Sequence, residues 1–185
     1  MKYRQLGKYG IRLSAIGIGS WLTYGMSIND KTALNCIKTA IENGIIFFDT
    51  ADIYNKGEAE LSLGRIFFDE LKITREDVVI ASKCFWPMSQ NPNDQGLSRK
   101  HVFESVHKSL KRLKTDYIDI YQCHRHDPNT PMEEICRSFN DLILQGKLLY
   151  WGVSEWSAEN IDEAAAVCEK YNLHRPVSNQ PQYNI

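Results

Sequence analysis

The sequence predicts an α/β protein, and within that class a (β/α)8 barrel of the TIM type. Short apolar runs alternate with longer helical patterns, and from Phe47 onward the runs recur about every 30 residues, the length of a βαβ unit. The runs are apolar throughout, as in parallel strands covered on both faces. The alternative, a doubly wound dinucleotide-binding sheet, requires Gly-x-Gly-x-x-Gly, whereas Gly17-Ile18-Gly19 is followed by Ser20-Trp21-Leu22.

The first half of the chain predicts a hairpin, three strands and two helices. Residues 3–13, with turn residues between Gly7 and Gly10, are expected to form a β-hairpin ahead of the repeat. Asp30 is a suitable N-cap for a helix that Gly44 ends. A second helix is expected over residues 58–71, and strands over residues 15–19, 45–48 and 78–81.

The second half predicts three more helices and three more strands. Ser98 can cap a helix with an apolar stripe that ends at Leu113. Thr130, Pro131 and Glu133 combine a cap, a proline in the first helical position and a capping-box acid, for a helix that ends near residue 146. Ser157 can cap a fifth helix. Strands are expected over residues 118–123, 149–153 and 176–179.

The strand count sets an expectation about how much of the barrel is present. A β/α barrel has eight strands and typically about 250 residues, whereas this chain has 185 residues. We therefore expect residues 1–185 to be one domain that holds the hairpin and the first six strands and is truncated on its C-terminal side.

Composition excludes several classes of function. The 22 Lys and Arg against 23 Asp and Glu give a net charge of −1, which offers no broad attraction for nucleic acid or an anionic membrane. The strongly apolar run at residues 45–48 is far too short to span a bilayer, and no signal peptide follows Met1. The five cysteines are scattered without a Cys-x-x-Cys pair. We therefore expect a reduced, cytoplasmic protein without membrane insertion.

Polar residues of complementary chemistry follow three successive predicted strands. Asp49 and Tyr54 come after the second strand, Lys83 after the third and His124 after the fourth. Each alone has an ordinary structural explanation, such as a turn, a loop aromatic, a solvated lysine or a satisfied histidine. In a β/α barrel, however, the carboxyl ends of the strands converge on one site, so the four together predict an active site.

The chemistry of these four residues suits carbonyl reduction. A tyrosine has an ordinary pKa of about 10, and a nearby Lys83 ammonium is expected to lower the pKa of Tyr54. Asp49 can hold Lys83 charged, and His124 can donate a hydrogen bond to a carbonyl oxygen. None of these side chains supplies a hydride, so the reaction requires a cofactor.

At these residues the sequence resembles the aldo-keto reductase family over its whole length. The matching pieces are Phe48-Asp49-Thr50-Ala51 with Tyr54, then Ser82-Lys83, His124, Gly152-Val153-Ser154 and Asn179-Gln180. Residues 96–101, 127–134 and 150–152 are similar to the branch that contains voltage-gated potassium channel β-subunits and their microbial reductase relatives.

The resemblance implies an NADP(H)-dependent reductase of aldehydes or ketones that needs no metal. It assigns Tyr54 as the general acid, Lys83 and Asp49 as the residues that tune it, and His124 as the residue that orients the carbonyl. Channel β-subunits often lack this histidine, so His124 favours an enzyme. The residues expected on the cofactor side are Ser20, Trp21, Asp49, Ser154 and Gln180, while Glu155 stands where many members have Asn or Arg.

Two groups of residues outside the tetrad have open interpretations. Tyr24, Trp86 and Trp156 either wall an aromatic substrate pocket or pack at loop bases. A basic cluster on the third helix is interpreted as a solvated helix face rather than a nucleic-acid site. Its members are Lys108, Lys111, Arg112 and Lys114.

Three other functions compete with the reductase. A metal-dependent hydrolase could use Cys84, Cys123, His124 and His126, although the remaining histidines offer few further ligands. The chain could instead be a non-catalytic interaction protein like a channel β-subunit, with a channel partner or as a homo-oligomer. It could also be an inactive fragment, because in the family the region that binds the adenosine 2′-phosphate follows the sixth strand.

Overall fold

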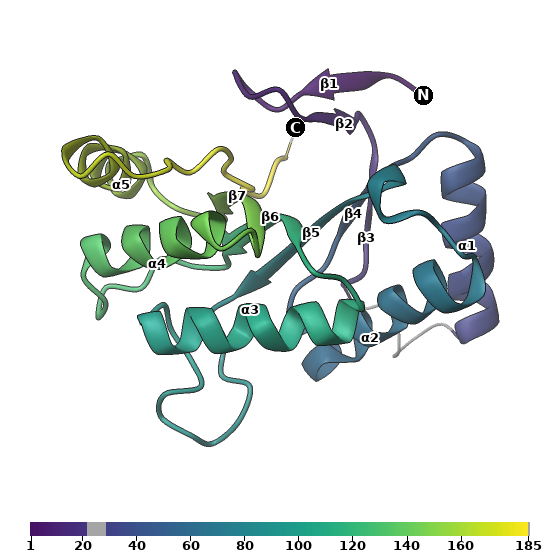
Figure 1. Cartoon of the computed structure of the whole chain (residues 1–185), viewed down its shortest axis with the longest axis horizontal. Coiled ribbons are helices and arrows are strands. Elements are labelled where there is room, and N and C mark those ends of the chain that lie inside the picture. The colour runs from purple at the N-terminus through teal and green to yellow at the C-terminus, as the bar shows by residue number, and fades with distance from the viewer. Residues whose placement is uncertain (22–28, 185) are drawn as a thin grey trace.

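The computed structural model describes residues 1–21 and 29–184 (Figure 1). Strands β1 (Tyr3–Gln5) and β2 (Arg12–Ser14) form an antiparallel hairpin. A separate parallel sheet has the strand order β3-β4-β5-β6-β7. Its strands are β3 (Gly17–Gly19), β4 (Phe47–Asp49), β5 (Val79–Cys84), β6 (Ile118–Cys123) and β7 (Leu148–Val153). The helices are α1 (Asp30–Glu42), α2 (Glu58–Gly64), α3 (Arg99–Leu113), α4 (Met132–Leu144) and α5 (Ala158–Lys170).

This architecture confirms the predicted hairpin and the alternation of strand and helix. The second helix continues from α2 into a π-helical segment, Arg65–Glu70, and short 3-10 turns lie at Tyr54–Gly57 and Arg75–Asp77. In place of the predicted sixth strand at residues 176–179, the structure has a single parallel β-bridge between Val153 and Asn179. That bridge nevertheless extends the same sheet order by one position.

Two helix caps differ from the sequence prediction. Asn29, not Asp30, is the N-cap of α1, and its side chain accepts the backbone N–H of Thr32 at 2.9 Å. At α4 the cap position falls on Pro131, because the Thr130 hydroxyl donates to Asp127 instead, at 2.8 Å. The caps predicted at Ser98 and Ser157 are confirmed, since each side chain accepts a first-turn N–H of its helix.

The outer face of the sheet packs against the helices, which lie to the left, right and bottom of it in Figure 1. Side chains alternate between the two faces of a strand. Phe48, Ile80 and Tyr121 accordingly join helix residues in the main core, where Phe139 of α4 stacks on Trp151 of β7 with ring centroids 4.8 Å apart. This packing fixes the curvature and order of the strands that carry the site.

The inner face of the sheet carries a smaller apolar cluster, which we call the inner cluster. It consists of Val79, Ala81 and Ile120, with partly buried residues from the hairpin and neighbouring strands around it. Leu6, Ile11 and Leu13 of the hairpin region pack against it, and the ring centroids of Tyr9 and Tyr150 lie 5.9 Å apart. The hairpin therefore covers the amino-terminal end of the inner face.

A buried ion pair joins α2 and α3 behind β5. Arg112 donates from Nε to Glu60 at 2.6 Å, and the other oxygen of this fully buried carboxylate accepts the Ser82 hydroxyl at 2.6 Å. Arg112 is therefore not part of a solvated face, in contrast to the sequence interpretation. Lys108, Lys111 and Lys114 are exposed as expected.

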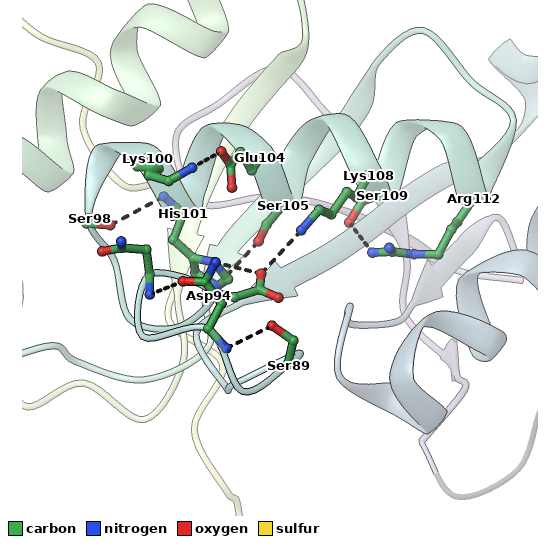
Figure 2. A network of polar contacts seen from close by, with 12 residues as sticks. Ser89, Asp94, Ser98, Lys100, His101, Glu104, Ser105, Lys108, Ser109 and Arg112 are labelled. Carbon is green, nitrogen blue, oxygen red and sulfur yellow. Dashed lines mark hydrogen bonds and ion pairs between the residues drawn. The ribbon is translucent and has the colours of Figure 1, made fainter.

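The polar loop between β5 and α3 is tied to α3 through Asp94 (Figure 2). The Asp94 carboxylate lies 3.2 Å from Lys108 Nζ and 3.6 Å from Nδ1 of the buried His101. At the end of the loop, the Leu97 N–H donates to Asp127 at 2.8 Å. These contacts fix a loop that includes Trp86, which lies beside the predicted active site.

Candidate active site

The alternation along the strands brings the predicted catalytic residues to the inner face. Asp49 ends β4, Lys83 lies two residues beyond Ala81 on β5, and His124 directly follows β6. Lys83 and His124 share a strand face with members of the inner cluster, because residues an even number apart point the same way. The inner cluster fills the amino end of this face, so the polar residues occupy its carboxyl end, where β/α barrels place their chemistry.

Tyr54 reaches the same place through a tight turn after β4. The 3-10 turn Tyr54–Gly57 contains Asn55 and Lys56 at φ values of 49° and 51°, followed by Gly57 at 95°. A non-glycine residue with such a φ is uncommon. The turn places the Tyr54 hydroxyl 3.5 Å from Lys83 Nζ.

Lys83 is the centre of the site. Its side chain is 1% exposed, and Nζ donates to both oxygens of Asp49 at 2.8 and 2.7 Å and to the Thr50 carbonyl at 2.8 Å. Burial lowers the pKa of Lys83, and the Asp49 carboxylate opposes that shift. The ammonium thus has a fixed position under the phenol.

The pKa of Tyr54 is raised to about 12, first by burial and then by the Asp49 carboxylate, while Arg125 acts to lower it. The expected lowering of this pKa is therefore wrong in direction, and Lys83 is not among the causes of the shift. The reason is geometric: Lys83 lies closer to Asp49 than to Tyr54, so the carboxylate offsets the ammonium's field. Tyr54 keeps its proton at neutral pH and can donate it.

His124 completes the group. Its ring packs edge-on against Tyr54, with centroids 5.7 Å apart. Burial, followed by the charges of Lys83 and Arg125, lowers the pKa of His124 to about 3. The imidazole is therefore neutral under physiological conditions and can donate a hydrogen bond to an oxygen without transferring a proton.

These four residues line one cavity of about 670 Å³. Its size lies within the range of small-molecule and cofactor sites. Trp21 and Trp86 form aromatic walls, with 64% and 38% of their surfaces exposed. The cavity above Lys83 and Asp49 is thus bordered by aromatic side chains that are in contact with solvent.

Three of the four further residues predicted on the cofactor side line the cavity. They are Trp21, Ser154 and Gln180. The Ser154 hydroxyl donates to the Gln180 carbonyl oxygen at 3.0 Å, which brings these two residues together. Ser20 does not line the cavity, because it is buried and its hydroxyl donates to Thr50 at 2.8 Å. Glu155 also lines the cavity and accepts the Gln182 N–H at 2.5 Å.

The predicted aromatic wall is partly right. Trp86 lines the cavity, whereas Trp156 is 4% exposed and packs edge-on against His126 in the protein interior. Tyr24 lies outside the described residues. Arg125 also lines the cavity, and sequence reasoning gave it no role although it directly follows His124.

Two observations on the described residues concern metal binding and membrane insertion. Among residues 1–21 and 29–184, no three His, Cys, Asp or Glu side chains are grouped so that they could hold a metal ion. In the same part of the chain, no helix combines the length and apolar character needed to cross a membrane.

The fold and the site together define a β/α-barrel protein with a Tyr-Lys-Asp-His site at the carboxyl ends of its strands. Residues 15–185 match the Aldo/keto reductase family, and the chain belongs to that family. A solved structure of a thermostable aldo-keto reductase in complex with the inhibitor epalrestat is similar to the whole chain at 32% identity and a TM-score of 0.85, with 63% of that structure covered.

The curated relatives include proteins named as potassium channel subunits. The chain is 44% identical over 185 residues to a probable voltage-gated potassium channel subunit beta of Oryza sativa subsp. japonica. It is 43% identical to a protein of the same name from Arabidopsis thaliana and 47% identical to a putative one from Schizosaccharomyces pombe. The chain spans 56%, 56% and 53% of the lengths of these relatives.

Proposed function

We propose that the protein is an NADP(H)-dependent reductase of aldehydes or ketones and that Tyr54 is its general acid. The observation that supports this most is Lys83, buried between the Asp49 carboxylate and the Tyr54 hydroxyl at the floor of an open cavity. Burying a lysine costs free energy unless it is paired, and here the pairing places the charge directly beneath a protonated phenol.

The residues present fit a nicotinamide cofactor on one side of the cavity. Ser154 and Gln180 line it together, and the side-chain amide of Gln180 has no hydrogen-bond partner within the described part of the chain. These two residues would hold the carboxamide, and Trp21 would contribute to the same side. When bound, the cofactor would supply the hydride that the side chains cannot supply.

The protein's own residues perform the proton transfer and the orientation of the substrate. Neutral His124 donates a hydrogen bond to the carbonyl oxygen and holds it beside Tyr54. As negative charge develops on that oxygen, the Tyr54 hydroxyl donates its proton. The Lys83 ammonium, held by Asp49, stabilises the phenolate that remains.

Substitution of the proton donor tests this proposal. In the full-length protein we expect oxidation of NADPH with 4-nitrobenzaldehyde, and we expect Tyr54→Phe to reduce kcat by about 100-fold or more, the usual contribution of a general acid. Tyr171→Phe removes a hydroxyl at the end of α5, away from the cavity, and is the matched control. Equal rates for wild type and Tyr54→Phe would exclude Tyr54 as the acid.

A second function, association with a potassium channel, is favoured by the names of the relatives from rice, Arabidopsis and fission yeast. Stable co-purification of the protein with a potassium channel from detergent-solubilised membranes would support it. Tyr54→Phe should leave that association intact if the surface, rather than the reaction, mediates it. Loss of association in this variant would couple the two functions.

A further inference from the structure

We propose that Arg125 makes this site selective for carbonyl substrates that carry an anionic group, such as a carboxylate. The inference rests on the proposed reductase function and adds a substrate class to it. Its basis is an arginine without a carboxylate partner, held among the described residues at the wall of the active-site cavity.

Arg125 is positioned by the residue that precedes it and by an aromatic ring. It directly follows His124, and its Nη1 donates to the His124 carbonyl oxygen at 2.6 Å. Its guanidinium carbon lies 5.7 Å from the centroid of Trp86, whose ring lies edge-on to His124 at 6.3 Å. The guanidinium is therefore fixed beside the residue proposed to hold the substrate carbonyl.

The charge of Arg125 is not neutralised within the described part of the chain. Arg4 and Arg12 of the hairpin are exposed to solvent. Every other arginine in this part forms an ion pair with a carboxylate, as Arg75 does with Asp119 at 2.6 Å. The others so paired are Arg65, Arg99, Arg112, Arg137 and Arg175. Arg125 is half-buried and has no such partner.

Lys83, Asp49 and Glu155 are the other charged groups on the cavity wall. Lys83 is paired with Asp49. Glu155 keeps its negative charge while accepting the Gln182 N–H, but it is not among the causes that shift the pKa of Tyr54 or His124. The positive charge of Arg125 reaches the reacting groups, because it contributes to the lowered pKa of His124 and partly opposes the rise in the pKa of Tyr54. A ligand near these two residues therefore lies close to a cation that has no ion-pair partner within the described part of the chain.

The chemistry of the cavity wall defines the ligand. A guanidinium binds a carboxylate with two parallel hydrogen bonds, and Trp86 with Trp21 offers flat apolar surface. An aldehyde with an aromatic or short apolar body and a carboxylate fits both features. The phosphates of the cofactor are a second source of anionic oxygen, but Arg125 lies beside His124, where the carbonyl compound is expected.

The test compares two aldehydes that differ in charge. The kcat/KM of full-length protein is measured with 4-carboxybenzaldehyde and with its neutral methyl ester, methyl 4-formylbenzoate. A hydrogen-bonded charge pair stabilises a complex enough to change affinity by about 10- to 100-fold. We expect Arg125→Gln to lower the ratio of kcat/KM for the acid to kcat/KM for the ester by this factor. Arg125→Lys keeps the positive charge but cannot form the two parallel hydrogen bonds of a guanidinium, so we expect it to lower the ratio less.

Arg175→Gln is the matched control, since Arg175 pairs with the exposed Glu169 of α5 and does not line the cavity. Its acid-to-ester ratio should equal that of wild type. An unchanged ratio in Arg125→Gln overturns the proposal. Equal losses on both aldehydes with a raised KM for NADPH also overturn it, because they assign Arg125 to a cofactor phosphate.

A binding measurement separates failure of this inference from failure of the proposed function. If wild type reduces neither aldehyde, the reductase proposal fails. Quenching of tryptophan fluorescence by 4-(hydroxymethyl)benzoate, compared with its methyl ester, then still reports on Arg125. Preference for the acid that Arg125→Gln abolishes supports an anion site, and equal binding of acid and ester contradicts it.

Discussion

Tyr54 and His124 show how strongly the immediate surroundings of a side chain change its pKa. The two rings touch edge-on beside a buried ammonium, yet one keeps its proton far above neutrality and the other loses it far below. Burial is the first cause in both cases, because it disfavours phenolate and imidazolium alike. At neutral pH both groups are thus uncharged hydrogen-bond donors, as carbonyl reduction requires.

The depressed pKa of His124 predicts a loss of stability in acid. The unfolded chain takes up a proton at this residue below about pH 6.5, whereas the folded protein resists protonation until about pH 3. Stability that depends on His124 is therefore present above pH 6.5 and is lost as the pH falls toward 3, at no more than about 1.4 kcal/mol per pH unit.

Urea unfolding of wild type and His124→Asn at pH 7 and pH 5 measures this effect. We expect the loss of unfolding free energy between these pH values to be about 2 kcal/mol smaller in the variant. The comparison also removes the contribution of His101, whose pKa burial lowers as well. Identical pH dependence in the two proteins would contradict the assignment.

At the scale of the elements, α2 and α3 are joined by an ion pair whose carboxylate is buried. Glu60 is fully buried, and its two oxygens accept hydrogen bonds from Ser82 of β5 and Arg112 of α3. Gly64 of α2 also packs so closely on α3 that a Cβ would lie 2.5 Å from the Arg112 carbonyl oxygen. The pair therefore depends on a close helix–helix contact that no local sequence pattern reveals.

Removal of one member of this pair should destabilise the protein. Arg112→Met leaves the Glu60 carboxylate buried without its cation, which costs about 3–5 kcal/mol of unfolding free energy. The double variant with Glu60→Gln should recover part of this loss, because the buried group is then neutral. Chemical denaturation measures both.

Lys111→Met, at the exposed neighbouring position of α3, serves as the control and should stay within about 0.5 kcal/mol of wild type. If Arg112→Met and Lys111→Met unfolded at the same urea concentration, the ion pair would make no contribution to the unfolding free energy. This outcome would also restore the interpretation of Arg112 as part of a solvated face.

At the scale of the whole molecule, the sequence predicted the strand order and the site better than it predicted side-chain partners. Strand positions and the tetrad follow from apolar periodicity and from the rule that chemistry lies at the carboxyl ends of parallel strands. The roles of Ser20, Trp156 and Arg112 depend on contacts with distant segments. Thr50, His126 and Glu60 provide those contacts, and periodicity carries no information about them.

The length relation to the relatives gives a prediction about cofactor binding. The chain spans 53–56% of the three curated relatives, and the cavity residues proposed to hold the cofactor, Trp21, Ser154 and Gln180, all lie on its nicotinamide side. We expect residues 1–185 alone to bind NADPH weakly or not at all, and a form extended to the length of these relatives to bind it tightly. Fluorescence titration of NADPH with both proteins measures the difference, and tight binding by residues 1–185 would contradict the expectation.

The β1–β2 hairpin has a kinetic consequence for such an enzyme. The hairpin covers the amino end of the inner face. Ligands therefore approach Lys83 and Tyr54 from the carboxyl ends of the strands. The cofactor and the carbonyl compound would then enter through the same opening of the cavity. The molecule that binds second would have to dissociate before the molecule that binds first can dissociate. Exchange of the cofactor would therefore wait for departure of the alcohol, so product inhibition patterns should reveal a compulsory order.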